Sequence, residues 1–449
     1  MEGLCSVGIN FRKKLLVLLS AAAITAGASQ AAFAEGFGVY EWSAAGTAMG
    51  EAYMFGEEDP SVLAYNPAQI TKLDGTYFSI GASLVNPDTK VLFNGLKGSL
   101  LNSHWGNNNV WENEYDPAVI PYMYYATKAG ENSWWGVAMF SRFGNQIEYD
   151  DLWPGRYDTI FSGIKGFTVQ PTYAFKIGDK LSAAVGLDIN YVKLRMRKSI
   201  PGAALAPGMG IGDIGTDLEG DTVNVGWVAS LMYDFTPKTS LAVTYRSRIK
   251  HTMDDADMSL SGLEALGIRG VGASGTVTLP DSLSIGLGHK FNDRTRVEIN
   301  AVWTNWETYK NLDIYFNPAI SATLPTGQPI ALPYSKNEKN WEACWRYGIG
   351  IEHKLSKQWS ILAGYVFDES PIPDSTMDFT VPTGDRHRGS LGFKYRFKEN
   401  HEIVFAYTGI WADSRETQSR VSPGADYQSS EIFDGFTQVI SLGYTIKLK

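Results

Sequence analysis

The chain has 449 residues, of which 44% are hydrophobic and 13% aromatic, with 46 glycines and 13 tryptophans. Its formal net charge is −9, and no basic cluster occurs after the first 34 residues, so the composition gives no indication of nucleic-acid binding. Beyond the N-terminal apolar stretch no run is long enough to cross a bilayer as a helix, so we do not expect a helical membrane protein.

The first 34 residues are predicted to be a cleaved secretory signal peptide. Arginine and lysines at 12–14 precede an apolar stretch from Leu15, and Ala32-Phe33-Ala34 has the small-x-small pattern of a cleavage site. A retained membrane anchor is the alternative, but the apolar core is shorter than a spanning helix requires. The exported chain would keep one cysteine, Cys344, and therefore no internal disulfide.

The next segment, residues 35–75, is too long for a simple tail and too apolar for a linker. It contains Asn66-Pro67-Ala68 between apolar residues. Proline fixes its own φ, donates no hydrogen bond and disfavours helical geometry at Asn66. The segment is therefore predicted to contain a rigid corner.

From about residue 76 onward the hydrophobic pattern has period two. In "SLAVTYRSRI" (240–249), Leu241, Val243, Tyr245 and Ile249 are predicted to share one face, with polar residues on the other. The same split recurs in "SLSIGLGHKF" (282–291) and "SLGFKYRF" (390–397). These segments are predicted to be half-apolar β-strands.

Connectors of two lengths separate the predicted strands. Six short ones lie at 129–132, 177–180, 236–238, 292–294, 355–358 and 398–400, and seven long ones at 93–117, 148–165, 198–222, 253–280, 309–343, 371–385 and 414–431. This alternation predicts fourteen strands in a closed antiparallel transmembrane β-barrel, in which no backbone edge meets lipid. A soluble β-sandwich is the alternative, and it rarely needs strands and loops this long.

The segment before the first strand contains a series of short motifs: Gly36-Phe37, Glu41-x-Ser43, the small residues of 46–52, Glu58-Asp59 and Asn66-Pro67-Ala68. In these motifs it closely resembles the start of the FadL/TodX family of outer-membrane channels for fatty acids and hydrocarbons, and segments such as "IEYDDLWPGRY" (147–157) follow in family order. The resemblance implies a fourteen-stranded barrel at 76–449, with seven long extracellular loops and an N-terminal hatch at 35–75 inside the lumen. Phe37, Glu41, Asn66, Pro67 and Ala68 would then be hatch residues.

Two long connectors are candidates for capture of an apolar ligand. Leu260, Leu263 and Leu266 have helix-like spacing in a segment predicted to face the medium. With Leu205 and Met209 of the preceding long connector they would form an apolar groove, a capture site that the resemblance implies. The alternative is that these side chains only pack on a neighbouring loop.

The charged residues near the predicted pocket indicate which class of substrate it would accept. The family often has a lysine before its Trp-Arg pair, whereas this chain has Glu342, which would repel a fatty-acid carboxylate if it faced the pocket. Lys198 and Arg346 remain as possible cationic partners for such a carboxylate. The alternative is that Glu342 pairs with a neighbouring cation. We predict a preference for neutral hydrophobic solutes.

The resemblance further implies sideways exit of the solute through an inward kink in the third strand. The matching stretch contains Phe143-Gly144-Asn145, where glycine interrupts a strand pattern as in a bulge or kink. These three residues are the predicted lateral gate.

The predicted function is passive uptake of hydrophobic small molecules, because no nucleotide-binding motif or energy-coupling segment is evident. A general porin is one alternative. An outer-membrane lipase or protease is another. Its candidate groups would be His251 with Asp254, Asp255 and Asp257, or Asp150 with Asp151, but no serine motif accompanies them. We expect no cofactor and no metal site. The expected partners are outer-membrane lipid, lipopolysaccharide and the barrel assembly machinery.

Overall fold

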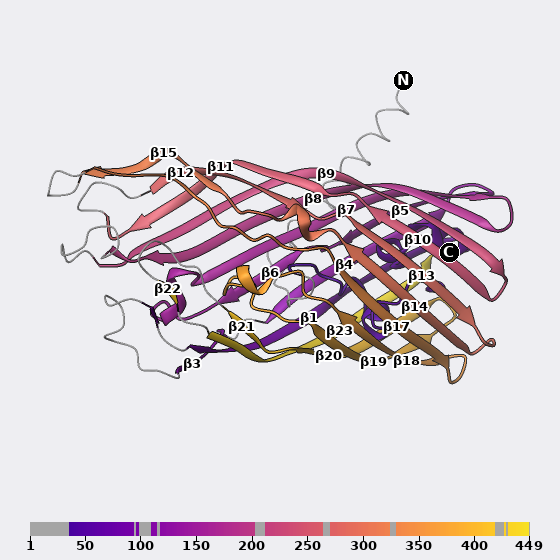
Figure 1. Ribbon diagram of the computed structural model, residues 1–449. Helices are drawn as coiled ribbons and strands as arrows, with labels where there is room; N and C mark the ends of the chain where they lie inside the picture. The colour runs from indigo at the N-terminus through magenta and orange to yellow at the C-terminus, as the bar shows by residue number, and fades with distance from the viewer. Residues whose placement is uncertain are drawn as a thin grey trace, which may run out of the picture.

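The computed structural model describes residues 36–93, 96–97, 109–114, 117–202, 212–263, 270–323, 329–417, 426–427 and 430–448. These residues form a closed antiparallel β-barrel of fourteen wall strands, several of them in two pieces (Figure 1). The predicted fold class is confirmed. None of the described helices is long and apolar enough to cross a membrane.

The wall strands follow one another around the barrel in chain order. They are β1 (Thr76–Phe93), β3 with β4 (Asn109–Glu112, Ala118–Lys128), β5 with β6 (Ser133–Phe140, Gly144–Glu148), β7 (Phe161–Ile177), β8 (Leu181–Ile200), β9 (Ile214–Thr236), β10 with β11 (Thr239–Arg246, Ile249–Ser261), β12 with β13 (Gly270–Leu279, Ser282–Lys290), β14 with β15 (Thr295–Thr304, Ile314–Thr323), β16 with β17 (Pro329–Ser335, Cys344–Lys354), β18 (Trp359–Asp368), β19 (Arg386–Phe397), β20 with β21 (His401–Ala412, Arg415–Thr417) and β23 (Ser430–Leu448). A separate two-stranded sheet joins β2 (Leu96–Lys97) to β22 (Asp426–Tyr427).

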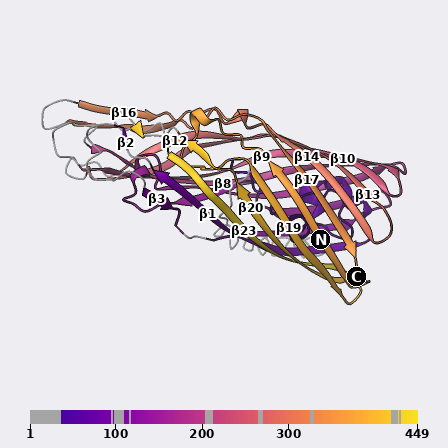
Figure 2. The same ribbon diagram turned by 60° about the horizontal axis from the view of Figure 1, so that its bottom comes forward.

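The first and last strands close the barrel. Thr76 of β1 lies opposite Leu448 of β23 on one side and opposite Thr127 of β4 on the other. Figure 2 shows β1 and β23 side by side. Short turns join the strands at the end that carries the C-terminus, here called the short-turn end, and the opposite end is called the long-loop end.

At the long-loop end the strands extend further than the sequence predicted. β11 and β12 occupy most of the predicted loop at 253–280, so the helix-like interpretation of Leu260 was wrong for this strand residue. Buried Ala256, Met258 and Leu260 alternate with exposed Asp257 and a serine, which is the period-two pattern of a hairpin. Strands also occupy parts of the predicted loops at 198–222 and 309–343.

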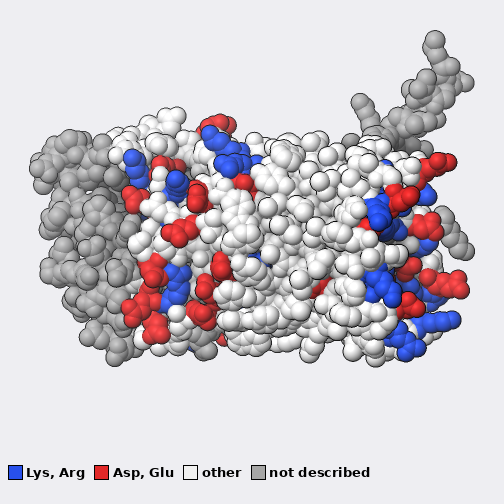
Figure 3. All heavy atoms as spheres, turned by 45° about the vertical axis from the view of Figure 1, so that its right-hand side comes forward, with Lys and Arg blue, Asp and Glu red and all other residues white. Residues whose placement is uncertain are grey.

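The outer face of the wall changes from apolar to charged along each strand. On β9, Val223 and Val225 are exposed, and the next outward positions toward the long loops are Asp221 and Glu219. Lys193 of β8 lies opposite Asp221, so the change occurs at the same height on both strands. Figure 3 shows charged side chains gathered toward both ends, with an uncharged zone between them. This zone matches the apolar band of an outer-membrane barrel.

One predicted face was wrong at a strand break. Tyr245 of β10 points outward, but Ile249 of β11 is buried inside. The chain leaves regular strand geometry at Ser247 and Arg248, so the alternation of the two faces restarts at Ile249.

The residues before β1 lie within the ring of strands (Figure 1). They include the helices α2 (Ala44–Ala48), α3 (Val62–Tyr65) and η1 (Pro67–Lys72), which are short and mostly buried. The Ser43 hydroxyl caps α2 by accepting a 3.0 Å hydrogen bond from the Gly46 N–H. We call residues 36–75 the N-terminal segment.

Candidate functional site: the lumen and a break in its wall

The third wall strand is broken between β5 and β6. β5 pairs with β4 as far as Met139 opposite Met123, and β6 pairs with β7 from Gly144 opposite Lys165. Residues 118–122 of β4 pair with β1 on one side, whereas no ladder joins them to β6 within the described part of the chain. The wall therefore has a gap in its hydrogen bonding between β4 and β6.

The start of the N-terminal segment pairs with this break. The Val39 N–H donates a 2.8 Å hydrogen bond to the Arg142 carbonyl, and Gly38 lies opposite Phe143 as an antiparallel β-bridge. We call residues 36–40 the N-terminal limb. The limb thus supplies backbone partners where β5 has left β4.

Aromatic packing holds the limb in place. The Gly144 N–H donates a 2.9 Å hydrogen bond to the Phe37 carbonyl, and the Phe37 ring has four aromatic neighbours at centroid distances of 4.6–6.2 Å. These neighbours are Phe143, Trp306, Tyr309 and Trp341. One buried apolar cluster therefore joins the limb, the break and the connectors after β14 and before β17.

Gly36 is required by this packing. Its φ is +67°, and a Cβ atom there would lie 2.1 Å from the Trp341 ring. An L-residue would be strained by both the backbone conformation and the contact. Glycine is the residue that lets the limb approach Trp341 so closely.

Two segments from the long-loop end fold into the lumen above the limb. Tyr149 and Trp153 stack with centroids 4.0 Å apart, and Phe379, from the connector after β18, lies 5.1 Å from Trp153. The Phe379 N–H donates a 2.7 Å hydrogen bond to Asp158. Burial, assisted by the nearby charge of Asp378, raises the pKa of Asp158 to about 7.

The connector after β18 also touches the break directly. The Asn145 amide donates a 3.1 Å hydrogen bond to the Thr380 carbonyl. Lys339 forms an ion pair with Asp378, and its ammonium also lies 3.2 Å from the Thr380 hydroxyl. The closed lumen is therefore held by contacts among segments that are far apart in sequence.

An apolar cavity lies on the inner side of the extended strands β8, β9, β11 and β12, next to β15. It encloses about 370 Å³ between atoms, part of it open to solvent. The side chains that line it are mostly apolar or small; the larger ones are Leu194, Leu218, Met253, Val277, Leu312 and Ile314. A site of this composition suits an apolar molecule.

The predicted capture residues fall only partly within the described structure. Leu260 is buried in a cluster that shares Leu218 with this cavity, and Leu263 packs against the cluster. Leu205, Met209 and Leu266 lie outside the described residues.

The predicted charged residues are dispersed. Lys198 lies on the inner face of β8, where its charge interacts with that of Asp158. Arg346 is buried with its guanidinium 3.6 Å from the centroid of the Tyr40 ring. Glu342 is exposed, and the preference for neutral solutes stays a prediction.

The predicted hatch residues contact the inner wall. Glu41 forms a buried ion pair with Arg388 of β19. Pro67 is the first residue of η1, and the following Ala68 N–H donates a 2.8 Å hydrogen bond to the Ser230 hydroxyl of β9. The Asn66 amide donates a 3.0 Å hydrogen bond to the Met54 carbonyl, which fixes the corner within the segment.

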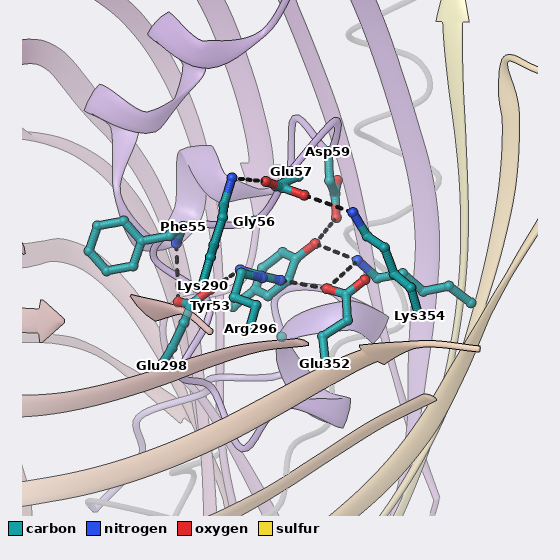
Figure 4. Close-up of polar contacts among 12 residues, drawn as sticks. Tyr53, Phe55, Gly56, Glu57, Asp59, Lys290, Arg296, Glu298, Glu352 and Lys354 are labelled. Carbon is teal, nitrogen blue, oxygen red and sulfur yellow. Dashed lines mark hydrogen bonds and ion pairs between the residues drawn. The ribbon is translucent and has the colours of Figure 1, made fainter. Parts of the chain in front are cut away.

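Toward the short-turn end, buried charges join the N-terminal segment to the wall (Figure 4). Arg296 forms ion pairs with Glu298 and Glu352, and the second of these joins their nitrogen and oxygen at 2.6 Å. Lys394 lies 3.2 Å from Glu352, and the Phe55 N–H donates a 3.1 Å hydrogen bond to Glu298. We call Arg296, Glu298, Glu352 and Lys394 the wall network.

Nearer the solvent, Glu57 of the N-terminal segment lies between two lysines of the wall. It forms an ion pair with Lys290 and another, at 3.1 Å, with Lys354 (Figure 4). These groups line the open vestibules of the short-turn end, where most lining side chains are polar or charged.

The sequence analysis did not identify the charged side chains that the wall strands direct into the lumen. Arg386, Arg388 and Lys394 occupy alternate positions of β19 and are buried. The signal was present, because three cations at even spacing in "RHRGSLGFK" share the face opposite to Leu391 and Phe393. A lumen that holds an internal segment requires such inward-facing charges for ion pairs.

A family model described as "Outer membrane protein transport protein (OMPP1/FadL/TodX)" matches residues 25–447. A long-chain fatty acid transport protein of Escherichia coli strain K12 is 23% identical, with 87% of this chain and 91% of that protein covered. The outer membrane protein NMB0088 of Neisseria meningitidis is 26% identical, with coverage of 97% and 99%.

Two solved structures share the fold. A FadL homologue of Pseudomonas aeruginosa superposes with a TM-score of 0.80 at 20% identity, covering 92% of this chain and 100% of the other. The toluene transporter TodX of Pseudomonas putida gives a TM-score of 0.63 at 19% identity, with 92% and 99% covered. Together with the match over almost the whole sequence, the barrel and its internal segment lead to one conclusion: the chain belongs to the OMPP1/FadL/TodX family of outer membrane transport proteins.

Proposed function

We propose that this chain is an outer-membrane channel for passive uptake of hydrophobic compounds, either long-chain fatty acids or aromatic and aliphatic hydrocarbons. The observation that carries the proposal is the gap between β4 and β6, which the N-terminal limb occupies. The long-loop end faces the medium and the N-terminal segment acts as a hatch. The relatives named for fatty-acid and toluene transport support this reading.

Entry begins at the extended strands. The apolar cavity near Leu218 and the cluster around Leu260 offer a hydrophobic surface at the long-loop end. An apolar solute leaves water there with a gain of about 25 cal/mol per Å² of buried surface. From this surface the solute passes toward the aromatic cluster around Phe37.

Exit is sideways, through the gap guarded by Phe143, Gly144 and Asn145. Passage through the short-turn end would disrupt the buried wall network, and breaking one buried ion pair costs about 3–5 kcal/mol. Val119, beside the gap, is exposed on the outer face, so the gap adjoins the apolar band. A solute that moves sideways therefore enters lipid directly.

The alternatives have less support. A general porin needs a water-filled lumen, whereas here buried residues of the N-terminal segment occupy it. For an enzyme, His251 would need a hydrogen-bonded acid, but both its ring nitrogens are buried without a partner among the described residues, and Asp254 is exposed. The Escherichia coli relative is named for long-chain fatty acid transport and TodX for toluene transport.

Two partners belong to the same proposal. Outer-membrane lipid surrounds the apolar band, with lipopolysaccharide in contact with the charged zone of Lys193 and Arg195 above it. The barrel assembly machinery inserts the chain.

A reversible crosslink tests the gating role of the limb. Gly38→Cys with Phe143→Cys, in a Cys344→Ala background, places two thiols on directly opposed positions, where antiparallel Cα atoms lie about 4.5–5.5 Å apart. We expect oxidised cells to take up oleate and toluene at least about tenfold more slowly than reduced cells, because the limb can no longer leave the break.

Ser79→Cys with Thr445→Cys is the matched control, since it joins two wall strands whose hydroxyls already lie 3.0 Å apart. Its uptake is expected to be the same under both conditions. Unchanged uptake by the oxidised Gly38–Phe143 pair would exclude limb movement as the gate.

A further inference from the structure

His251 of β11 lies on the short-turn side of the apolar cavity near Leu218. It shares the inner face of β11 with Met253 and is directly opposite Val277 of β12, and both of these residues line the cavity. The residues before and after His251 are exposed on the outer face, whereas His251 itself is fully buried. The imidazole is therefore a polar group at the margin of an apolar site.

The neighbouring strands place two asparagines in line with this imidazole. Gly226 of β9 lies against β11, because a Cβ atom there would be 2.8 Å from the Ile249 side chain. The two strands are antiparallel, so His251, the next inward residue of β11, lies beside Asn224, the next inward residue of β9. Asn190 of β8 is directly opposite Asn224. We call His251, Asn224 and Asn190 the polar row.

Several atoms of the polar row have no hydrogen-bond partner. Both ring nitrogens of His251 and the Oδ1 atom of Asn190 are buried without a partner in the described parts of the chain. The amide nitrogen of Asn190 already donates to the Thr168 hydroxyl at 2.9 Å, and that of Asn224 donates to the Thr222 hydroxyl at 3.3 Å. Burial of an unpaired polar atom costs free energy, so the row is suited to a ligand that supplies the missing bonds.

The charged neighbours of the row leave acceptors in excess. Asp188, on the same face of β8 as Asn190, accepts a hydrogen bond from Arg142 at Oδ2, while its Oδ1 is buried without a partner among the described residues. Arg246 lies 3.9 Å from the same Oδ2 atom but directs its hydrogen bonds to other groups. The two Oδ1 atoms can only accept, and a neutral imidazole accepts at one nitrogen and donates at the other.

This balance favours a solute with a hydroxyl group. A hydroxyl can donate to one free acceptor and accept from the ring N–H, whereas a hydrocarbon leaves all of these atoms unpaired. A carboxylate would add acceptors where acceptors are already in excess. Met253, which lines the cavity beside His251, has an unbranched side chain with three rotatable bonds and can turn to let a solute reach the ring.

We propose that the polar row binds the hydroxyl group of a neutral hydrophobic solute, such as a phenol or a long-chain alcohol, with His251 as the residue that contacts the hydroxyl. The apolar part of the solute would occupy the cavity near Leu218. This inference rests on the proposed channel function and extends it to a substrate class that is neither a hydrocarbon nor a fatty acid.

The test measures binding of p-cresol and of p-xylene to the purified full-length protein. The two ligands have similar size and shape and differ by a hydroxyl in place of one methyl group. We expect His251→Phe to lower the ratio of p-cresol to p-xylene affinity about fivefold or more, because the hydroxyl loses its partner. His251→Gln keeps a donor and an acceptor and should retain most of the ratio.

His353→Phe is the matched control. Its ring is bonded to the Thr295 hydroxyl and lies on the opposite face of β17 from the buried Glu352, so the change should alter neither affinity.

A second variant decides the question if His251→Phe does not fold. Asn224→Leu removes the amide at the centre of the polar row at a position that is only partly buried, and it should also lower the ratio. An unchanged ratio in the folded variants, or equal losses for both ligands, would overturn the hydroxyl site. So would a loss in His251→Gln as large as that in His251→Phe. Failure of the channel function itself would be distinguishable, because cells with the wild-type protein would then take up neither ligand faster than cells without it.

Discussion

At the residue scale, single buried groups determine how the closed lumen is held. Gly36 is required by its positive φ and by the Trp341 ring. Asp158 accepts a hydrogen bond from the Phe379 N–H while its carboxyl is buried near Asp378. Each of these groups links a local requirement to a contact between distant segments.

The raised pKa of Asp158 predicts a pH-dependent lumen. Because the folded pKa, about 7, is above the ordinary value of 3.8, the protonated carboxyl favours the closed arrangement. This contribution, on the order of 4 kcal/mol, is complete below about pH 4 and is lost as pH rises toward 7. Hydrogen exchange of residues 370–385, corrected for intrinsic rates, should therefore accelerate between pH 5 and 8.

Asp158→Asn is the control for this prediction. The asparagine keeps an acceptor for the Phe379 N–H but does not ionise, so its corrected exchange should be nearly independent of pH. If the wild-type and variant proteins showed the same pH profile, the titrating group would not be Asp158.

At the element scale, the N-terminal segment is fastened more firmly at one end than at the other. One buried ion pair, Glu41–Arg388, fixes it to β19. Hydrogen bonds from the Phe55 N–H to Glu298 and from Lys394 to the Tyr53 hydroxyl fix its short-turn side to β14 and β19, whereas the limb relies on a few backbone bonds and aromatic contacts. Motion of the limb alone therefore requires no separation of the buried charges of the wall network.

Substitutions in the Glu41–Arg388 ion pair test whether buried charge holds the N-terminal segment in place. Arg388→Met leaves Glu41 buried and unpaired, which should destabilise the attachment of residues 36–52 by about 3–5 kcal/mol and raise single-channel conductance. Glu41→Gln with Arg388→Met removes both charges and should recover most of the loss. Heat-modifiable migration on gels, which reports the folded barrel, should remain normal in both.

If the Glu41→Gln, Arg388→Met protein had the same raised single-channel conductance as Arg388→Met alone, the ion pair would not be what holds the segment in place. The more exposed pair of Glu57 and Lys354 offers a comparison, because exposed pairs contribute only about 0–1 kcal/mol. Glu57→Gln should change conductance little.

The sequence predicted the β-strands better than the tertiary contacts between distant segments. Fourteen strands followed from turn residues and period-two patterning, which are local signals. The pairing of Gly38 with Phe143, and of Phe37 with Trp341, depends on closure of the barrel and has no local signal. The helix-like interpretation of Leu260 was wrong because an i,i+3 spacing to Leu263 also occurs where a strand ends.

At the scale of the whole molecule, the polarity of the wall reverses with height. Within the band the outward residues are apolar, and beyond it the outward residues are charged while the inward ones, such as Met258 and Leu260, are apolar. The outer face of these strands is therefore suited to contact lipid within the band. Above the band, their inner face is suited to contact an apolar solute.

This arrangement predicts the orientation of the barrel in the outer membrane. In a Cys344→Ala background, Ser261→Cys at the end of β11 should react with a membrane-impermeant maleimide in intact cells. Asp179→Cys, in the turn after β7, should react only after the cells are broken. The opposite pattern would reverse the topology and place the capture surface in the periplasm.

The length of β11 has a consequence for where uptake begins. Residues 254–261 of β11 lie beyond the apolar band, because Asp257 pairs with Glu219 of β9, and at about 3.3 Å per residue and a tilt near 40° they rise roughly 20 Å above it. Lipid head groups and the first sugars of a saccharide coat lie within that height. In the proposed route, a solute bound near Leu260 therefore lies above the lipid head groups, and protein shields its path from there into the lumen.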